Sequence, residues 1–188
     1  MTPTRALAAL PAALVAFVWL LLAGCVSVEP LAARSDKPPV AQFLLTARLS
    51  IRVDQRVDVV RVRWKRDDGE ERIDFFSPFG SQIAELVQPA GGPATLQRGK
   101  DRETAPNIND FTAKLLGVQL DIREMALWTQ GAGLTVNQTR TIASADGAVW
   151  QVTLEGVAQV EGYDHATRLS AAKEGVIVKM FIEEWRPQ

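Results

Sequence analysis

The sequence predicts an α+β fold, in which an antiparallel sheet carries helices against one of its faces. Three observations lead to this prediction. Apolar and polar side chains alternate with a period of two from residue 43 to about residue 97, the period changes to 3.6 between residues 107 and 130, and strand-like alternation returns after residue 133. Strands and helices that are segregated along a chain in this way are typical of an antiparallel sheet with a helical layer.

The clearest strand signal lies between residues 43 and 53, where apolar and polar side chains alternate strictly. A strand with one buried and one solvated face has this pattern. A second strand, with Arg61, Arg63 and Lys65 on its polar side, precedes the polar hairpin turn 67–70. A third strand covers residues 72–76. The apolar positions of the first two strands are Phe43, Leu45, Ala47, Leu49, Ile51, Val53, Val60, Val62 and Trp64.

Two shorter strands complete this first group. The turn at residues 77–80 leads into a fourth strand at residues 82–88. A break rich in glycine and proline at residues 89–93 separates it from a short strand at residues 94–97.

The first predicted helix begins near residue 107. Ile108, Phe111 and Leu115 share one face at helical spacing. Asn107 suits the N-cap, and Gly117 ends the helix, because glycine adopts the left-handed conformation that follows many helices.

A second helix is predicted from residue 122 to residue 130. Asp121 and Glu124 have the spacing of a capping box, and Gly131 ends the helix. Its apolar stripe consists of Ile122, Met125 and Trp128.

Strands return in the C-terminal part. Asp146-Gly147 is a strong hairpin signal, and Trp150, Val152 and Leu154 alternate with polar residues after it. The turn 173–175 joins the last two strands, whose apolar positions include Leu169, Ala171, Val176, Val178, Met180 and Ile182.

Residues 22–25, Leu-Ala-Gly-Cys, end an apolar run that follows Arg5, and Cys25 is the only cysteine. The segment resembles a bacterial lipoprotein signal, which implies cleavage after residue 24 and acylation of Cys25. Two alternatives are an ordinary signal peptide with a chance cysteine and an uncleaved membrane helix. Pro11 and the short basic flank argue against the helix. The sequence therefore predicts a signal peptide at 1–24, a flexible tether at 25–42 and one domain at 43–188.

Composition excludes several functions. After removal of Arg5, 20 basic residues face 22 acidic ones, a net charge of −2, so no general attraction to nucleic acid is expected. One cysteine and one histidine are too few for a zinc site of His and Cys ligands, and His165 is expected in a solvated loop. We expect no catalytic residue, no metal and no cofactor besides the lipid on Cys25, although a carboxylate pair for hydrolysis stays open.

The turn Ser77-Pro78-Phe79-Gly80 places a phenylalanine where turn tips are usually polar. Pro78 suits the first central position of a type I turn, so Phe79 occupies the second and points outward. Two interpretations are open. Phe79 is either a core residue of a loop that folds back, or an exposed apolar tip that is aimed at a membrane.

Several segments together resemble the LolB family of outer-membrane lipoproteins, which act as receptors in the Lol lipoprotein-sorting pathway. Each motif is short, but the order and spacing of the set, with the lipoprotein signal in front, are fairly specific. The matching segments are residues 43–53, the basic run Arg61 to Trp64, the loop from Phe76 to Ser81, Lys114 to Gly117, Leu127-Trp128 with Gly131, and Val178 to Trp185. Residues 156–167 depart from the family pattern, which leaves the strand register there open.

The resemblance implies a half-closed, incomplete antiparallel barrel with helices lidding an apolar cavity. It implies a monomer, anchored by lipid to the outer membrane and facing the periplasm, that accepts lipidated proteins from a LolA-like carrier and inserts them into the membrane. Val26, rather than an aspartate, follows Cys25, which supports the outer membrane. The insertion loop would be Ser77, Pro78, Phe79 and Gly80, and the cavity would be lined by Leu49, Ile51, Val62, Trp64, Phe75, Trp150, Val152 and Met180.

Two other classes of function stay open at this stage. The chain could be a structural lipoprotein that braces an outer-membrane assembly through a protein interface. It could also be a membrane-bound hydrolase with a carboxylate pair. An apolar cavity would distinguish the receptor from the structural protein.

Cys25 is expected to be the lipidated N-terminal residue of the mature protein. Cells that produce the wild-type chain in the presence of labelled palmitate should yield a labelled protein, and Cys25→Ala should abolish incorporation. Label in the Cys25→Ala protein would refute the assignment.

Overall fold

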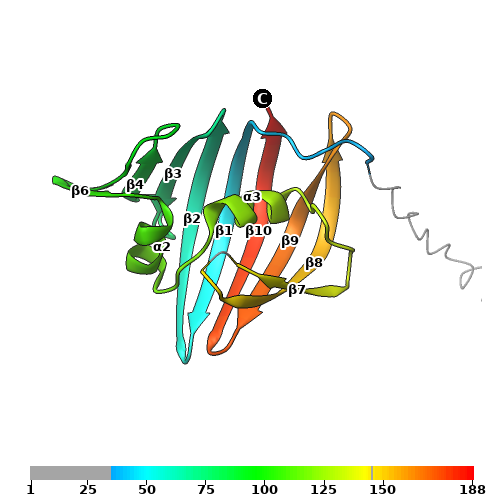
Figure 1. Cartoon of the computed structure of the whole chain (residues 1–188). Helices are drawn as coiled ribbons and strands as arrows, with labels where there is room; N and C mark the ends of the chain where they lie inside the picture. The colour runs from blue at the N-terminus through cyan, green and yellow to red at the C-terminus, as the bar shows by residue number, and fades with distance from the viewer. Residues whose placement is uncertain (1–34, 145) are drawn as a thin grey trace, which may run out of the picture. The chain divides into compact units, whose positions relative to one another are not determined.

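A computed structural model describes residues 35–144 and 146–188, so the signal segment and Cys25 lie outside the described residues. These residues form one ten-stranded sheet that curves around two helices (Figure 1). No helix in the described part is long and apolar enough to cross a bilayer.

The sheet is antiparallel throughout, in the order β6-β5-β4-β3-β2-β1-β10-β9-β8-β7. Strands that follow one another in the chain are neighbours in the sheet, except for β6 and β7, and the first strand, β1, pairs with the last, β10, at the centre. The end strands β6 and β7 do not pair with each other, so the barrel is open, as predicted. The strands are β1 Phe43–Val53, β2 Arg56–Asp67, β3 Glu70–Phe76, β4 Gln82–Gln88, β5 Ala94–Arg98, β6 Asp101–Ala105, β7 Thr139–Ala143, β8 Val149–Val160, β9 Tyr163–Lys173 and β10 Val176–Pro187.

The alternation in the sequence determines which face of the sheet is buried. On β1 the apolar positions from Phe43 to Ile51 are at most 2% exposed, and they lie on the concave, helix-covered face. Aromatic rings fill the space above this face. The ring of Phe43 lies 5.2 Å from that of Trp64, edge to face, and 6.3 Å from that of Trp185. Burial of each such side chain contributes about 1.5–3 kcal/mol.

Both predicted helices are present, although the N-cap of the first is Ile108 rather than the predicted Asn107. Helix α2 covers Asn109–Leu116, and Asn107 Oδ1 accepts from the backbone N–H of Asp110 at 3.2 Å. Helix α3 covers Ile122–Thr129, and Asp121 Oδ1 accepts from Arg123 N and Glu124 N. Gly117 and Gly131 adopt left-handed φ angles of 73° and 65°, which end the two helices.

Two strands were not expected from the sequence. Strand β6 reads Asp-Arg-Glu-Thr-Ala and β7 reads Thr-Arg-Thr-Ile-Ala, and neither contains a fully buried residue. Each lies at an edge of the sheet, where neither face is fully covered, so no alternation of apolar residues is needed. Backbone pairing with β5 and β8 holds these two strands in place.

The expectation for His165 was wrong. His165 lies in β9 and is 7% exposed, and its ring stacks on Trp185 with centroids 5.4 Å apart and planes 10° from parallel. The segment 156–167 forms a hairpin rather than a loop. Glu161 and Gly162 form its two-residue turn with φ angles of 53° and 76°, the left-handed pair of a type I′ turn, and register shifts on either side of Gly156 displace the pairing.

The last part of the predicted tether lies against the domain. The side-chain amide of Gln130, at the end of α3, accepts from Val40 N at 2.7 Å and donates to Val40 O at 3.2 Å. Ser35 and Lys37 bond to the turn between β8 and β9, where Ser35 N donates to Asp164 and Lys37 Nζ donates to Glu161 O. The rest of the tether lies outside the described residues.

Acid should destabilise the fold partly through His165. Burial lowers the pKa of this imidazole below its usual value of 6.5, against the opposing effects of the Ala166 carbonyl and Asp164. Because the unfolded chain then binds the proton more readily, stability is full above the ordinary pKa and is lost as the pH falls through the folded one. His165→Phe keeps a ring beside Trp185 but has no group that takes up this proton. Its melting temperature should therefore fall less than that of wild type between about pH 7.5 and about pH 5.5. An equal loss in the two proteins would contradict the assignment.

Candidate functional site

The residues predicted to line a cavity all lie on the concave face and in one apolar cluster. They come from β1, β2, β3, β8 and β10, so the curvature of the sheet brings distant parts of the chain together. None is more than 3% exposed: Leu49, Ile51, Val62, Trp64, Phe75, Trp150, Val152 and Met180. The sequence pattern therefore identified the apolar interior.

Among the described residues, little free space lies between α3 and the strands beneath it. Helix α3 covers β9 and β10 with Met125 and Trp128, and Trp128 meets Trp150 edge to face at 6.4 Å. Between α3 and the two strands lies a void of about 10 Å³. A void of that size holds about one water molecule. An acyl chain therefore fits between α3 and these two strands only if the helix moves away from the sheet.

Most of the residues around this void were not assigned to the cavity from the sequence. Met180 is the only member of the predicted set among them. The helical period had already placed Met125 and Trp128 on one apolar stripe, and this was the available signal that the stripe faces the interior. The full lining is Leu120, Met125, Trp128, Leu169, Ala171, Val178 and Met180.

A buried carboxylate lies between the sheet and the first turn of α3. Glu71 on β3 is 6% exposed and accepts a hydrogen bond from Trp64 Nε1 at 2.6 Å, while Arg66 lies 3.3 Å away. Burial raises the pKa of the Glu71 carboxyl, and the Trp64 bond and the charges of Arg66 and Arg123 act in the opposite direction.

The turn after β3 has the predicted geometry. Gly80 N donates to Ser77 O at 2.9 Å, which closes a four-residue turn with Pro78 and Phe79 at its centre. Gly80 has a φ of 85°, and Ser77 N donates to Ser81 O at 2.8 Å. Phe79 is 96% exposed, so the core interpretation of this side chain is excluded.

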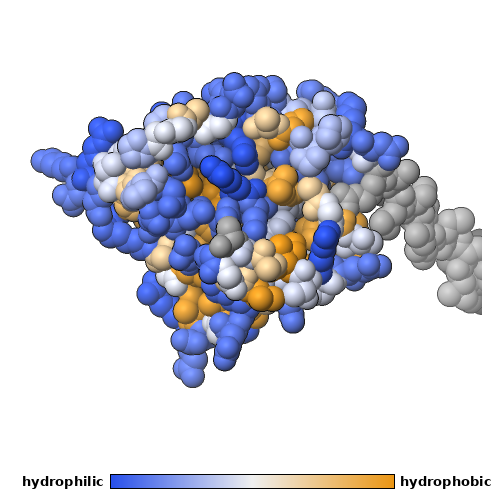
Figure 2. All heavy atoms as spheres, viewed as in Figure 1, coloured by the Kyte–Doolittle hydropathy of each residue, from blue (hydrophilic) through white to orange (hydrophobic). Residues whose placement is uncertain are grey.

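The molecule is mostly hydrophilic on the helix-covered side, and apolar residues show beside the helical layer and at the lower end of the sheet (Figure 2). The residues that the structure describes contain no group of three or more His, Cys, Asp or Glu side chains that could hold a metal ion.

Comparison with known proteins now assigns the family. The family model for "Outer membrane lipoprotein LolB" matches residues 41–185. This chain belongs to the LolB family. Related proteins named outer-membrane lipoprotein LolB include one from Chromobacterium violaceum, 27% identical over 89% of this chain and 94% of the relative, and one from Aeromonas hydrophila, 23% identical over 88% and 91%. This LolB-family chain is accordingly an outer-membrane lipoprotein.

Two solved structures share the fold of this chain. A putative outer membrane lipoprotein-sorting protein domain from Vibrio parahaemolyticus aligns with a TM-score of 0.52 at 8% identity, over 79% of this chain and 86% of the other. A DUF1329 family protein from Desulfovibrio piger aligns with a TM-score of 0.53 at 9% identity, over the same shares. At such identities the likeness concerns the open, helix-covered sheet alone.

Exposure of Phe79 should make its replacement harmless to stability. Phe79→Glu should change the free energy of unfolding by no more than about 0.5 kcal/mol, as surface substitutions do. Phe75→Glu, four residues earlier on the concave face, should cost several kcal/mol because it buries a charge. Urea denaturation of both variants measures the difference. A large loss of stability in Phe79→Glu would show that this ring packs against the domain.

Proposed function

We propose that this chain is the outer-membrane receptor of a lipoprotein-sorting pathway. It accepts lipidated proteins from a LolA-like periplasmic carrier by taking up their acyl chains, and it inserts them into the inner leaflet of the outer membrane. The observation that supports this most is the match of residues 41–185 to the LolB family, together with one large cluster of buried apolar side chains. No chemical bond is made or broken in this reaction.

The cost of exposing acyl chains explains why an apolar interior is needed. A triacylated protein carries about 45 methylene groups, and each costs about 0.8 kcal/mol in water. Free passage through the periplasm would therefore cost tens of kcal/mol. The chains must pass from one apolar environment directly into another, and the concave face of this sheet supplies the second environment.

The small size of the void beneath α3 implies a conformational step for cargo that binds there. Helix α3 buries Met125 and Trp128, which line the void above β9 and β10. Apolar contacts are not directional, so an acyl chain that replaces the helix against β9 and β10 restores most of the buried area. Opening thus costs little once cargo is present, whereas without cargo it exposes the apolar face to water.

The exposed tip supplies the delivery end. Burial of one phenylalanine in a membrane contributes about 2–3 kcal/mol. That free energy is enough to orient a domain already tethered to the bilayer, but it is too small to anchor the domain alone. Phe79 therefore directs the molecule toward the leaflet that receives the cargo.

The alternative is a structural lipoprotein that braces an outer-membrane assembly. The small void beneath α3 is the observation that favours it, because a structural protein needs no space for an acyl chain. The two functions differ in one measurable property, since only the receptor binds acyl chains.

A handover experiment tests the proposal. The full-length chain is mixed with a carrier loaded with a radiolabelled lipoprotein, and label should move to this chain and change the fluorescence of its buried tryptophans saturably. Phe79→Glu should accept the label but fail to pass it into liposomes, because a charged tip resists entry into the acyl region. Val149→Glu, at an exposed valine on β8, is the matched control and should transfer normally. No movement of label to the wild-type chain would favour the structural alternative, and normal delivery by Phe79→Glu would remove the role of the tip.

A further inference from the structure

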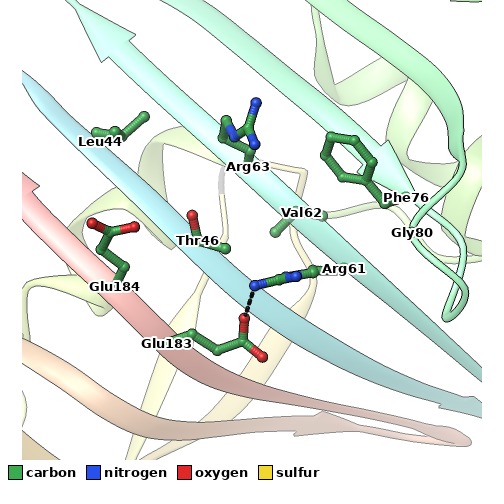
Figure 3. A pocket seen from close by; sticks show the side chains of 9 residues that line it. All are labelled: Leu44, Thr46, Arg61, Val62, Arg63, Phe76, Gly80, Glu183 and Glu184. Atoms are coloured by element: carbon green, nitrogen blue, oxygen red, sulfur yellow. Dashed lines mark ion pairs between the residues drawn. The ribbon is translucent and has the colours of Figure 1, made fainter.

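The outer face of the sheet carries a groove beside the tip loop. The groove has a volume of about 600 Å³ and lies on the side of β2 that faces away from the helices. Arg61 and Arg63 rise from β2, Glu183 and Glu184 from β10, and Gly80 forms part of the wall (Figure 3). Phe79, the exposed tip, is the residue next to Gly80.

A β-bulge places both glutamates on this face. Thr46 pairs with Glu184 and Ala47 pairs with Ile182, so Glu183 is an extra residue in β10. In a regular strand two consecutive side chains point to opposite faces, and a bulge removes that constraint. Glu183 and Glu184 therefore both line the groove.

Glu183 holds two arginines together. Arg48 and Arg61 are directly opposite each other on β1 and β2, a like-charge pair that by itself is unfavourable. The Glu183 carboxylate accepts from Arg48 at 2.9 Å and lies 2.7 Å from Arg61. The groove thus carries charges of both signs rather than a single-sign patch, and its Glu184 also pairs with Arg186.

Arg63 is held differently. Its guanidinium lies 5.5 Å from the centroid of the Phe76 ring, and Phe76 also lines the groove. Asp74 pairs with Arg63 across the strands and accepts a hydrogen bond from Gln82 at 3.1 Å. Stacking on an aromatic ring orients a guanidinium while its N–H groups stay available to a further acceptor.

We propose that this groove binds the headgroup of a phospholipid that carries a phosphate and a primary ammonium group. The phosphate is bound by Arg61 and Arg63, and the ammonium is bound by the carboxylates of Glu183 and Glu184. This inference rests on the proposed function in one respect, because it takes the loop at residues 77–80 as the part that enters the membrane.

Two observations favour such a headgroup. The groove presents donors and acceptors of both charges side by side, which matches a zwitterion better than a simple anion. The apolar tip and the charged groove are adjacent in the chain, as acyl and headgroup layers are adjacent in a leaflet. When Phe79 lies among acyl chains, Gly80 and the groove behind it lie at the depth of the headgroups. An acidic or basic protein partner would use the charges but would give no role to Phe79.

Vesicle binding by the full-length chain tests the site. Ser81→Cys is labelled with an environment-sensitive fluorophore, and the unmutated chain taken through the same labelling is the blank. Vesicles of phosphatidylethanolamine should shift the emission. Phosphatidylcholine, whose quaternary ammonium donates no hydrogen bond, and phosphatidylglycerol, which has no ammonium, should do so several-fold more weakly.

Variants of the groove then identify the residues. Arg63→Gln should weaken the response to phosphatidylethanolamine vesicles by about fivefold, the effect of one arginine at a membrane surface. Glu183→Gln and Glu184→Gln should remove the preference over phosphatidylglycerol. Arg102→Gln, an exposed arginine on the edge strand β6, is the matched control and should respond as wild type. Arg61→Gln would also remove one of the two ion pairs of Glu183, so its effect on vesicle binding would be ambiguous. Arg63→Gln removes neither of these ion pairs, so it is the decisive variant, provided that its melting temperature equals that of wild type.

Each outcome supports or overturns the site. An unchanged response of Arg63→Gln, or equal responses to the three vesicles, would overturn it. So would a variant that responds normally to vesicles but no longer receives cargo from the carrier, since the groove would then be a protein-docking face. If Phe79→Glu delivers cargo normally while Arg63→Gln loses vesicle binding, the headgroup site stands and the delivery role of the tip fails. If Phe79→Glu fails to deliver while Arg63→Gln binds vesicles normally, the delivery role of the tip stands and the headgroup site fails.

Discussion

The pairing of β1 with β10 is the constraint on which the rest of the structure depends. It is the one place where strands distant in sequence pair, and it joins the meander β1–β6 to the meander β7–β10. Without it each half would expose an apolar face that it cannot cover alone. Phe43 and Trp185, which stack near the start of this pairing, form part of the aromatic layer over which the helices lie. The same pairing contains the bulge that turns Glu183 outward, so the interior and the outer groove share one origin.

The two faces of the sheet have opposite physical characters, and the proposed function uses both. The concave face is apolar and is covered by α3, whose contacts are replaceable by any apolar chain. The convex face carries fixed charges whose positions follow from strand register. In the proposed function the receptor holds cargo weakly and recognises a membrane specifically. Apolar burial on the concave face supplies non-directional affinity, and charge pairs on the convex face supply orientation.

Much of this was predictable because the alternation along β1, β2 and β10 is strong and one face is fully buried. Asn107 and Asp121 likewise indicated where the two helices begin. The edge strands β6 and β7 gave no signal because neither of their faces is fully covered. His165 was assigned to a loop because it stands among Tyr163, Asp164 and Thr167, where no alternation of apolar and polar residues indicates a strand. Its burial depends on stacking on Trp185, which is a tertiary contact. The exposure of Phe79 and the bulge at Glu183 depend on three-dimensional packing. No local pattern in the sequence distinguishes a folded-back turn from a projecting one.

An open barrel has two free edges, and in this protein both are polar and short. Strand edges with unpaired N–H and C=O groups tend to add strands from other molecules. A lipoprotein is confined to a membrane surface. A given number of copies collide far more often there than they would if they were free in solution. The charged and hydroxyl side chains of β6 and the exposed Thr-Arg-Thr of β7 discourage such addition. The polar residues that made these two strands hard to recognise in the sequence therefore have a second consequence. They let many copies of an open sheet lie close together on a membrane without polymerising.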